Sequence, residues 1–129
     1  MALQVDIGQV LRFDNAWDYQ GPAYSWARLR CSIGQKPLGI FDELLYEDSE
    51  LILPATASWE RFSQREIITI TSKLARGGSY HLQVKIYEGV WLAEKIYAFW
   101  SLDNAIYVVK PEDIPPVEFR GLEVTISKT

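Results

Sequence analysis

Residues 65–110 read REIITITSKLARGGSYHLQVKIYEGVWLAEKIYAFWSLDNAIYVVK, and this stretch decides the fold class. Its clearest part is 80–87, where apolar and polar side chains alternate. Successive side chains of a β-strand face opposite sides of a sheet, so this alternation predicts a strand with one buried and one wetter face. Short turn signals such as Glu88-Gly89, expected to make a tight hairpin, separate it from its neighbours, and we expect four successive strands in 65–110. The residues expected to point inward are Tyr80, Leu82, Val84 and Ile86.

Length and composition predict one ordinary globular domain. The chain has 129 residues, of which 48% are apolar and 23% charged, so we expect a single domain over 1–129. A chain of this size buries enough surface to fold without a disulfide or a structural metal. The single cysteine, Cys31, cannot form an internal bridge, which favours a reducing compartment. We therefore predict a soluble, cytoplasmic protein.

Hydropathy and net charge argue against two classes of partner, membranes and nucleic acids. No apolar run reaches the ~18 residues of a membrane-spanning helix, so no membrane partner is expected. The net charge of −4 argues against nucleic acid held by the charge of the whole chain, so we expect no nucleic-acid partner either. Thirteen per cent of the residues are aromatic, which in a β protein is typical of core and cross-strand packing.

The first half of the chain predicts strands joined by polar loops. Residues 3–13 alternate and predict a strand that is bent or bulged near Gly8, since glycine tolerates the dihedral angles of a bulge. Turn residues in 14–22 predict a loop, and 24–33 alternates again as a strand. The segment 38–46 suits either a strand or a helix, and its strand-like surroundings favour the strand.

The second half continues the pattern. Residues 55–64 predict a connection with at most one helical turn. Residues 90–102 are apolar on both faces, which is typical of a strand covered on both sides. Asp103-Asn104 predicts a turn into a separate strand over 105–110.

The end of the sequence predicts a connector and a closing strand. Prolines in 111–116 favour extended polyproline geometry, and 117–127 alternates with a parity switch at Arg120-Gly121 that marks a bulge. The chain would then hold about eight or nine strands. We predict an all-β fold, an antiparallel β-sandwich with immunoglobulin-like or jelly-roll/C2-like topology, with a small closed β-barrel as the alternative.

One short run resembles a known structural motif. Residues 74–84, LARGGSYHLQV, place Leu, Gly and Tyr with the spacing of the tyrosine corner in fibronectin type III and other immunoglobulin-like domains. This resemblance covers 11 of the 129 residues and implies that the Tyr80 hydroxyl bonds to backbone a few residues upstream, where the chain crosses between sheets. Two further strands after 80–87 depart from that family, so the resemblance implies architecture and no function.

The sequence contains no group of residues that indicates catalysis or metal binding. The only histidine, His81, lies on the wetter face of its strand, and Cys31 lies on the inward parity, where a thiol is inert. Acidic groups occur, at 47–50 among other places, but no spacing matches a known calcium loop. We predict no catalytic residue, no metal and no cofactor, and expect a binding protein rather than an enzyme.

An aromatic and basic row is the one candidate binding site. Alternate positions of a strand project to one face, so the outward side chains of 24–33 would form a continuous strip. Two aromatic residues of the preceding loop extend it. Aromatic and arginine side chains are enriched at interface hot spots because they bury large areas. The residues predicted to bind are Trp17, Tyr19, Tyr24, Trp26, Arg28 and Arg30.

Two functions of different classes remain open from the sequence. The first is an interaction module that binds a protein partner, or a second copy as a homodimer, through this row, and Arg28 and Arg30 imply that the partner's surface is acidic. Carbohydrate is a further ligand class, because aromatic rings also stack on sugars. The second is a small β-barrel that holds an apolar ligand, suggested by the two-faced apolar strand. The alternative to a binding role is a structural one. In that case the aromatic and basic row lies under another strand, or its rings and guanidinium groups stack on each other.

Overall fold

The computed structural model describes residues 2–90, 93–110 and 118–127. These residues form seven strands and two short 3₁₀ helices, η1 (Pro37–Gly39) and η2 (Ser72–Leu74). No helix in these ranges is long and apolar enough to cross a membrane. The strands are β1 (Leu3–Val5), β2 (Val10–Gly21), β3 (Arg28–Gln35), β4 (Asp42–Glu50), β5 (Thr56–Thr69), β6 (Gly78–Glu88) and β7 (Lys95–Val108).

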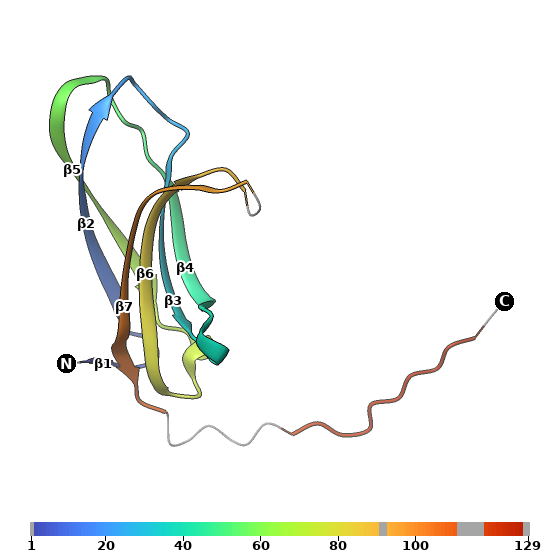
Figure 1. Ribbon diagram of the computed structural model, residues 1–129. Coiled ribbons are helices and arrows are strands. Elements are labelled where there is room, and N and C mark those ends of the chain that lie inside the picture. The colour runs from blue at the N-terminus through green and yellow to red at the C-terminus, as the bar shows by residue number, and fades with distance from the viewer. Residues whose placement is uncertain (1, 91–92, 111–117, 128–129) are drawn as a thin grey trace.

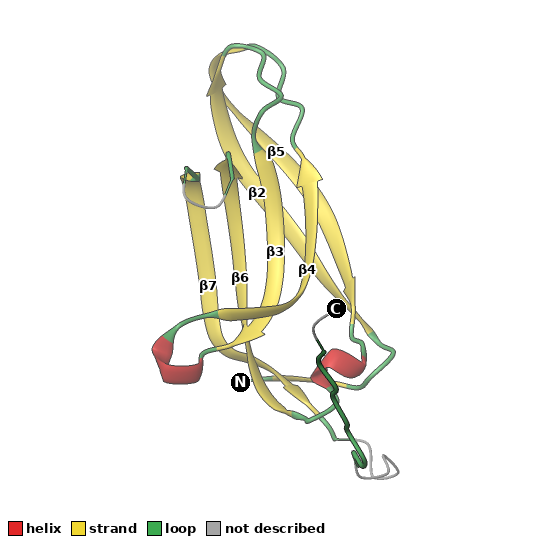
Figure 2. Ribbon diagram, turned by 90° about the vertical axis from the view of Figure 1, so that its right-hand side faces the viewer, coloured by secondary structure: helices red, strands yellow, loops and turns green. Residues whose placement is uncertain are grey.

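The strands form two sheets, so the all-β prediction is confirmed. One sheet has five strands in the order β1-β7-β6-β3-β4, and the other pairs β2 with β5 (Figure 1). Every pairing is antiparallel except that of β1 with β7, so the larger sheet is mixed and the prediction of a wholly antiparallel fold was wrong. Figure 2 shows the long β2–β5 pair crossing the larger sheet obliquely.

The main core lies where the two sheets face each other. Leu11 and Phe13 of β2 share one buried cluster with side chains of the larger sheet, among them Ile33 and Val108.

The strand expected over 24–33 begins only at Arg28, as β3, and Tyr24 before it forms an isolated bridge with Leu53. The inward parity expected for 24–33 is confirmed, because its apolar positions are buried and the alternate arginines are not. These inward residues are Ala27, Leu29, Cys31 and Ile33.

The corner at Tyr80 forms as expected. The buried Tyr80 hydroxyl donates a hydrogen bond to the Leu74 carbonyl at 3.3 Å and lies at the same distance from the Gly77 carbonyl. Helix η2 carries the chain from β5 in one sheet to β6 in the other, so this bond fixes the crossover. The strand predicted over 80–87 is confirmed within β6.

The expected strand over 3–13 is divided between the sheets. Gly8 has a φ of +94°, which L side chains rarely adopt, and the chain leaves the larger sheet there to enter β2. The bend at Gly8 was therefore expected correctly, but it separates two strands instead of bulging one.

The predictions of a loop over 14–22 and a connection over 55–64 were wrong. Both segments belong to one long antiparallel ladder, in which Asp14 lies opposite Arg65 and Asp18 opposite Arg61. The Asp14–Arg65 ion pair spans 2.8 Å, and the Asp18–Arg61 pair 3.3 Å. Polar residues that read as turn signals are thus cross-strand partners on an exposed face.

The ambiguous segment 38–46 is a strand in part. Its first residues lie in η1, where Leu38 has a φ of +55°, and β4 begins at Asp42. The acidic run at 47–50 continues β4 beside β3.

The separate strands expected over 90–102 and 105–110 are one strand, β7. The predicted turn at Asp103-Asn104 is a bulge, with Asn104 at a φ of +50° and a shift of register opposite β6. The expected cover on both faces is also wrong, because 95–104 is exposed on both faces. The two-residue hairpin expected at Glu88-Gly89 is longer, since β7 begins only at Lys95.

The closing strand expected over 117–127 does not form within the described residues. Residues 118–127 run as an extended segment without strand pairing and project away from the sheets (Figure 1). The connector expected over 111–116, and Val117 with it, lie outside the described residues. The bulge expected at Arg120-Gly121 does not form either, because the segment has no paired strand, although Gly121 has a φ of +70°.

Candidate interaction groove

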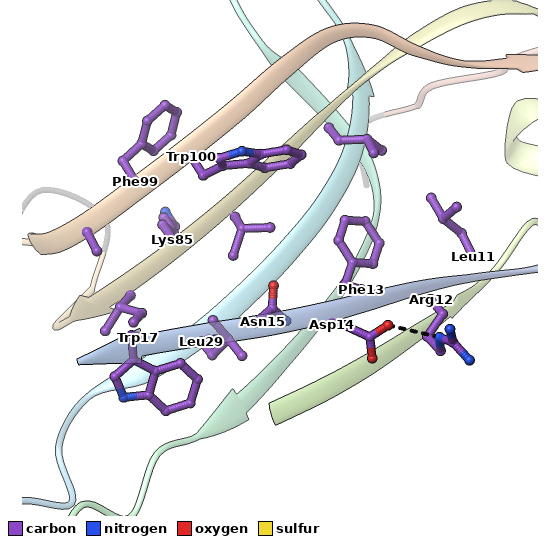
Figure 3. Close-up of a pocket in the computed structure, with 15 residues that line it drawn as sticks. Leu11, Arg12, Phe13, Asp14, Asn15, Trp17, Leu29, Lys85, Phe99 and Trp100 are labelled. Carbon is purple, nitrogen blue, oxygen red and sulfur yellow. Dashed lines mark hydrogen bonds and ion pairs between the residues drawn. The ribbon is translucent and has the colours of Figure 1, made fainter. Parts of the chain in front are cut away.

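A groove of about 430 Å³ lies between β2 and β7. Figure 3 shows β2 along one side and β7 along the other, with Trp100 over the space between them. Arg12 and Asp14, which pair at 3.1 Å, form a charged rim on the β2 side. The walls and floor are mostly apolar: Leu11, Phe13, Trp17, Leu29, Leu82, Val84, Ile86, Ala98 and Trp100.

The groove is open because the larger sheet is wider than the sheet that covers it. The register with β6 sets Trp100 opposite Val84 and Leu102 opposite Leu82, so these two side chains share the core-facing side of β6. Trp100 is nevertheless 48% exposed and Leu102 50%. In a complete two-layer core, side chains in such positions lie under the opposite sheet.

The outer edge of β7 is unpaired over 95–104. Strand β1 pairs with β7 only at 106–108, and among the described residues nothing else pairs with that edge. The outer edge of β2 is likewise unpaired in the described ladders, since β2 pairs only with β5. Unpaired strand edges present rows of N–H and C=O groups that accept a further strand. The groove is therefore bordered by two such edges.

A smaller aromatic hollow of about 320 Å³ continues from the groove at Trp17. Its rings include Tyr19, Tyr24 and Tyr97, over the buried Leu51 and Leu53. The Tyr24 hydroxyl bonds to the Glu88 carboxylate, and this hydrogen bond raises the pKa of Tyr24. The buried Trp17 Nε1 has no hydrogen-bond partner within the described part of the chain.

The predicted aromatic and basic row is divided between different surroundings. Trp17, Tyr19 and Tyr24 line the aromatic hollow. Trp26 precedes β3 and is 73% exposed. The two arginines lie on the outer face of the larger sheet, among carboxylates. The six residues therefore do not form one continuous strip.

The arginines of the row are held by a network on β3, β4 and β6. Arg30 pairs with Glu43 at 2.5 Å and with Asp48 at 3.0 Å, and its guanidinium lies 3.7 Å from the centre of the Tyr46 ring. Arg28 pairs with Asp48 at 2.5 Å. Their positive charge is largely neutralised within the chain, which weakens the case for an acidic partner at this face.

The same network shifts the pKa values of its carboxylates. Partial burial raises the pKa of Asp48, but hydrogen bonds from Tyr87, Arg28 and Arg30 outweigh it and leave this pKa below its usual value. Burial also raises the pKa of Glu43, and bonds from Arg30 and Ser32 again lower it overall.

This network makes the fold sensitive to acid. A carboxylate with a lowered pKa in the folded state stabilises it above its unfolded pKa, and that stabilisation is lost as pH falls through the folded value. The free energy of unfolding is therefore expected to fall as pH drops below the ordinary values of 4.5 for Glu43 and 3.8 for Asp48. Urea denaturation at pH 7, 4 and 3 measures it. Glu43→Gln should flatten the slope, and an equal slope in both proteins would contradict the assignment.

The two nucleophilic or basic candidates lie apart from the groove's walls. Cys31 is fully buried and unpaired, and burial raises the pKa of its thiol to about 11. The His81 Nδ1 accepts a hydrogen bond from the Asn104 amide at 3.0 Å. Neither lines the groove or the aromatic hollow.

Sequence reasoning missed the exposed apolar row of β7. The row comprises Ile96, Tyr97, Phe99, Trp100 and Leu102, each about half-exposed. The signal was present as apolar residues on both faces of 90–102, but it was interpreted as burial. An apolar strand that is exposed has the same sequence pattern as one that is covered on both faces.

The chain was compared with protein-family models, with curated proteins and with solved structures. None of the three comparisons finds a match.

Proposed function

We propose that this chain is a non-catalytic interaction module that binds an extended segment of a protein partner as an added strand beside β7. The observation that carries the proposal is the unpaired outer edge of β7 over 95–104, next to an apolar groove. In strand addition, main-chain hydrogen bonds supply affinity, and apolar pockets select every second side chain of the ligand. The groove supplies both.

The proposal also covers the architecture of the two sheets and the location of the protein in the cell. The two sheets would form a β-sandwich that is open between β2 and β7, in preference to a closed barrel, because both strands keep a free edge. A bound strand would fill that opening. A reducing, cytoplasmic location agrees with the free Cys31.

The residues of the predicted row have different parts in this proposal. Trp17 lines the groove itself and would contact a bound segment. Tyr19 and Tyr24, in the adjoining hollow, would hold a side chain at the segment's end, and the exposed Trp26 would extend the contact. Arg28 and Arg30 would stabilise the outer face through their carboxylate partners.

Two aromatic residues of β7 allow a matched test. Trp100 is 48% exposed and lies over the groove (Figure 3), whereas Tyr107 is 46% exposed and lines neither the groove nor the aromatic hollow. Ten-residue peptides selected from a random library on the full chain should alternate apolar side chains. Trp100→Ala should weaken binding of a selected peptide by about tenfold or more, as expected for an aromatic hot spot. Isothermal titration calorimetry measures the change.

Tyr107→Ala is the control, because it removes an equally exposed ring of β7 that does not line the groove. Its dissociation constant should stay close to that of the unchanged chain. Equal losses for both variants, or a library that gives no binding peptide, would contradict strand addition at this groove.

A second candidate function is the binding of a small apolar ligand in the aromatic hollow. The observation that favours it is the set of tyrosine rings over Leu51 and Leu53. The dye 8-anilinonaphthalene-1-sulfonate should fluoresce with the folded chain, and Tyr97→Ala should reduce this signal. Tyr107→Ala, at an equally exposed position of β7 outside the hollow, should not. Equal signals for the two variants would exclude the hollow as the site.

A further inference from the structure

Residues 118–127 are a second apolar element without a partner in the described part of the chain. Every second side chain from 122 is apolar, and Phe119 continues the row across the left-handed Gly121. The four large apolar side chains of this segment are between 75% and 93% exposed. A row exposed to this degree is typical of a site of protein association. These side chains are Phe119, Leu122, Val124 and Ile126.

The segment and the groove complement each other. The free edge of β7 over 95–104 is as long as 118–127, and each would span about 33 Å as a strand. The alternate apolar side chains would enter the groove, while Glu123 and Thr125 between them would face water. The left-handed Gly121 supplies the bulge that keeps Phe119 on the same face.

Two features favour a groove on another copy over the segment's own groove. Strand β1 occupies the edge of β7 at 106–108, between the end of β7 and its free stretch. A segment that folded back in its own chain would have to pass around β1. The intervening sequence also contains Pro111, Pro115 and Pro116, and proline-rich sequences favour semi-rigid spacers.

We propose that residues 118–127 of one copy of this chain bind as an added strand beside β7, in the groove of a second copy. This inference rests on the proposed function and names its partner. Each copy carries both an open groove and a free segment, so the contact permits either a reciprocal dimer or a head-to-tail chain.

The test uses the full chain and two exposed substitutions. Trp100→Glu places a charge in the groove, and Val124→Glu places one in the segment. The unchanged chain should associate as its concentration rises, as measured by sedimentation velocity. Each variant should weaken this association by about tenfold or more. Thermal melts monitored by circular dichroism check that both variants remain folded.

Mixing the two variants makes the test specific. The Trp100→Glu chain keeps its segment, and the Val124→Glu chain keeps its groove. The segment of the first can therefore bind in the groove of the second, so the mixture should form a heterodimer while neither variant associates alone. Tyr107→Glu, at an exposed position of β7 that does not line the groove, is the control and should associate like the unchanged chain.

The possible failures are distinct. An unchanged chain that stays monomeric at every concentration overturns the inference. If Trp100→Glu abolishes association but Val124→Glu does not, the groove binds another segment, so the inference fails and the proposed function survives. If neither variant alters association, the inference fails, and a failure of the library selection at Trp100 would then remove the proposed function as well.

Discussion

Replacing Gly34 by alanine should lower the free energy of unfolding by about 3 kcal/mol, the upper part of the range for overpacked cores. A Cβ at this position would lie 2.1 Å from the Asp42 carbonyl oxygen and 2.9 Å from the Phe41 ring. The oxygen belongs to the neighbouring strand β4, at a shift of register between β3 and β4, so relief requires that the two strands separate. Urea denaturation measures the loss.

Gly8→Ala is the matched control for this prediction. Gly8 has a φ of +94°, but nothing lies within 4 Å of the added Cβ. The expected cost is only the backbone strain of about 1–2 kcal/mol. A smaller loss for Gly34→Ala than for Gly8→Ala would show that the β3–β4 contact is looser than described.

Ile33→Ala should destabilise the fold by about 2–5 kcal/mol, because it leaves a cavity in the main core. Ile33 is 0% exposed and lies on β3 between Leu45 of β4 and Leu82 of β6. Both of these neighbours are held in paired strands, so they can move little to fill the cavity. Chemical denaturation of the two proteins gives the difference.

Ile67→Ala provides the comparison. Ile67 is 49% exposed on β5, so the same deletion should cost about 1 kcal/mol or less, the range of strand preference alone. Comparable losses at the two positions would contradict the placement of the core between the sheets.

Strong alternation was sufficient to predict β6 and the inward row of β3. The inward residues of β3 are buried as expected. In β6 the expected row is buried at Tyr80 and Leu82 and half-buried at Val84 and Ile86, whereas Tyr87, of the outward parity, is buried.

Residues 14–21 of β2 and 56–64 of β5 were not predictable in this way, because residues such as Asp14 and Asp18 favour turns when they are considered locally. Only the cross-strand partners Arg65 and Arg61, 43 or more residues away, make these positions suit a strand.

The candidate site was only partly predictable for a similar reason. Trp17 was chosen for its ring and does line the groove. The charges of Arg28 and Arg30 suggested an acidic partner, but that charge meets Glu43 and Asp48 of the adjacent strand. The pairing depends on strand order, which local periodicity does not contain. Apolar residues on both faces of β7 likewise fit either a covered strand or one with a free edge.

Hydrogen exchange at β7 tests strand addition most directly. In an edge strand, every second amide bonds to the neighbouring strand and the others point to the open edge. When a selected decapeptide saturates the full chain, the open-edge amides between Ile96 and Leu102 should exchange at least about tenfold more slowly, as amides do on joining a ladder. Amides that already bond to β6 should change much less. Unchanged exchange at the open edge with the peptide bound would contradict strand addition at β7.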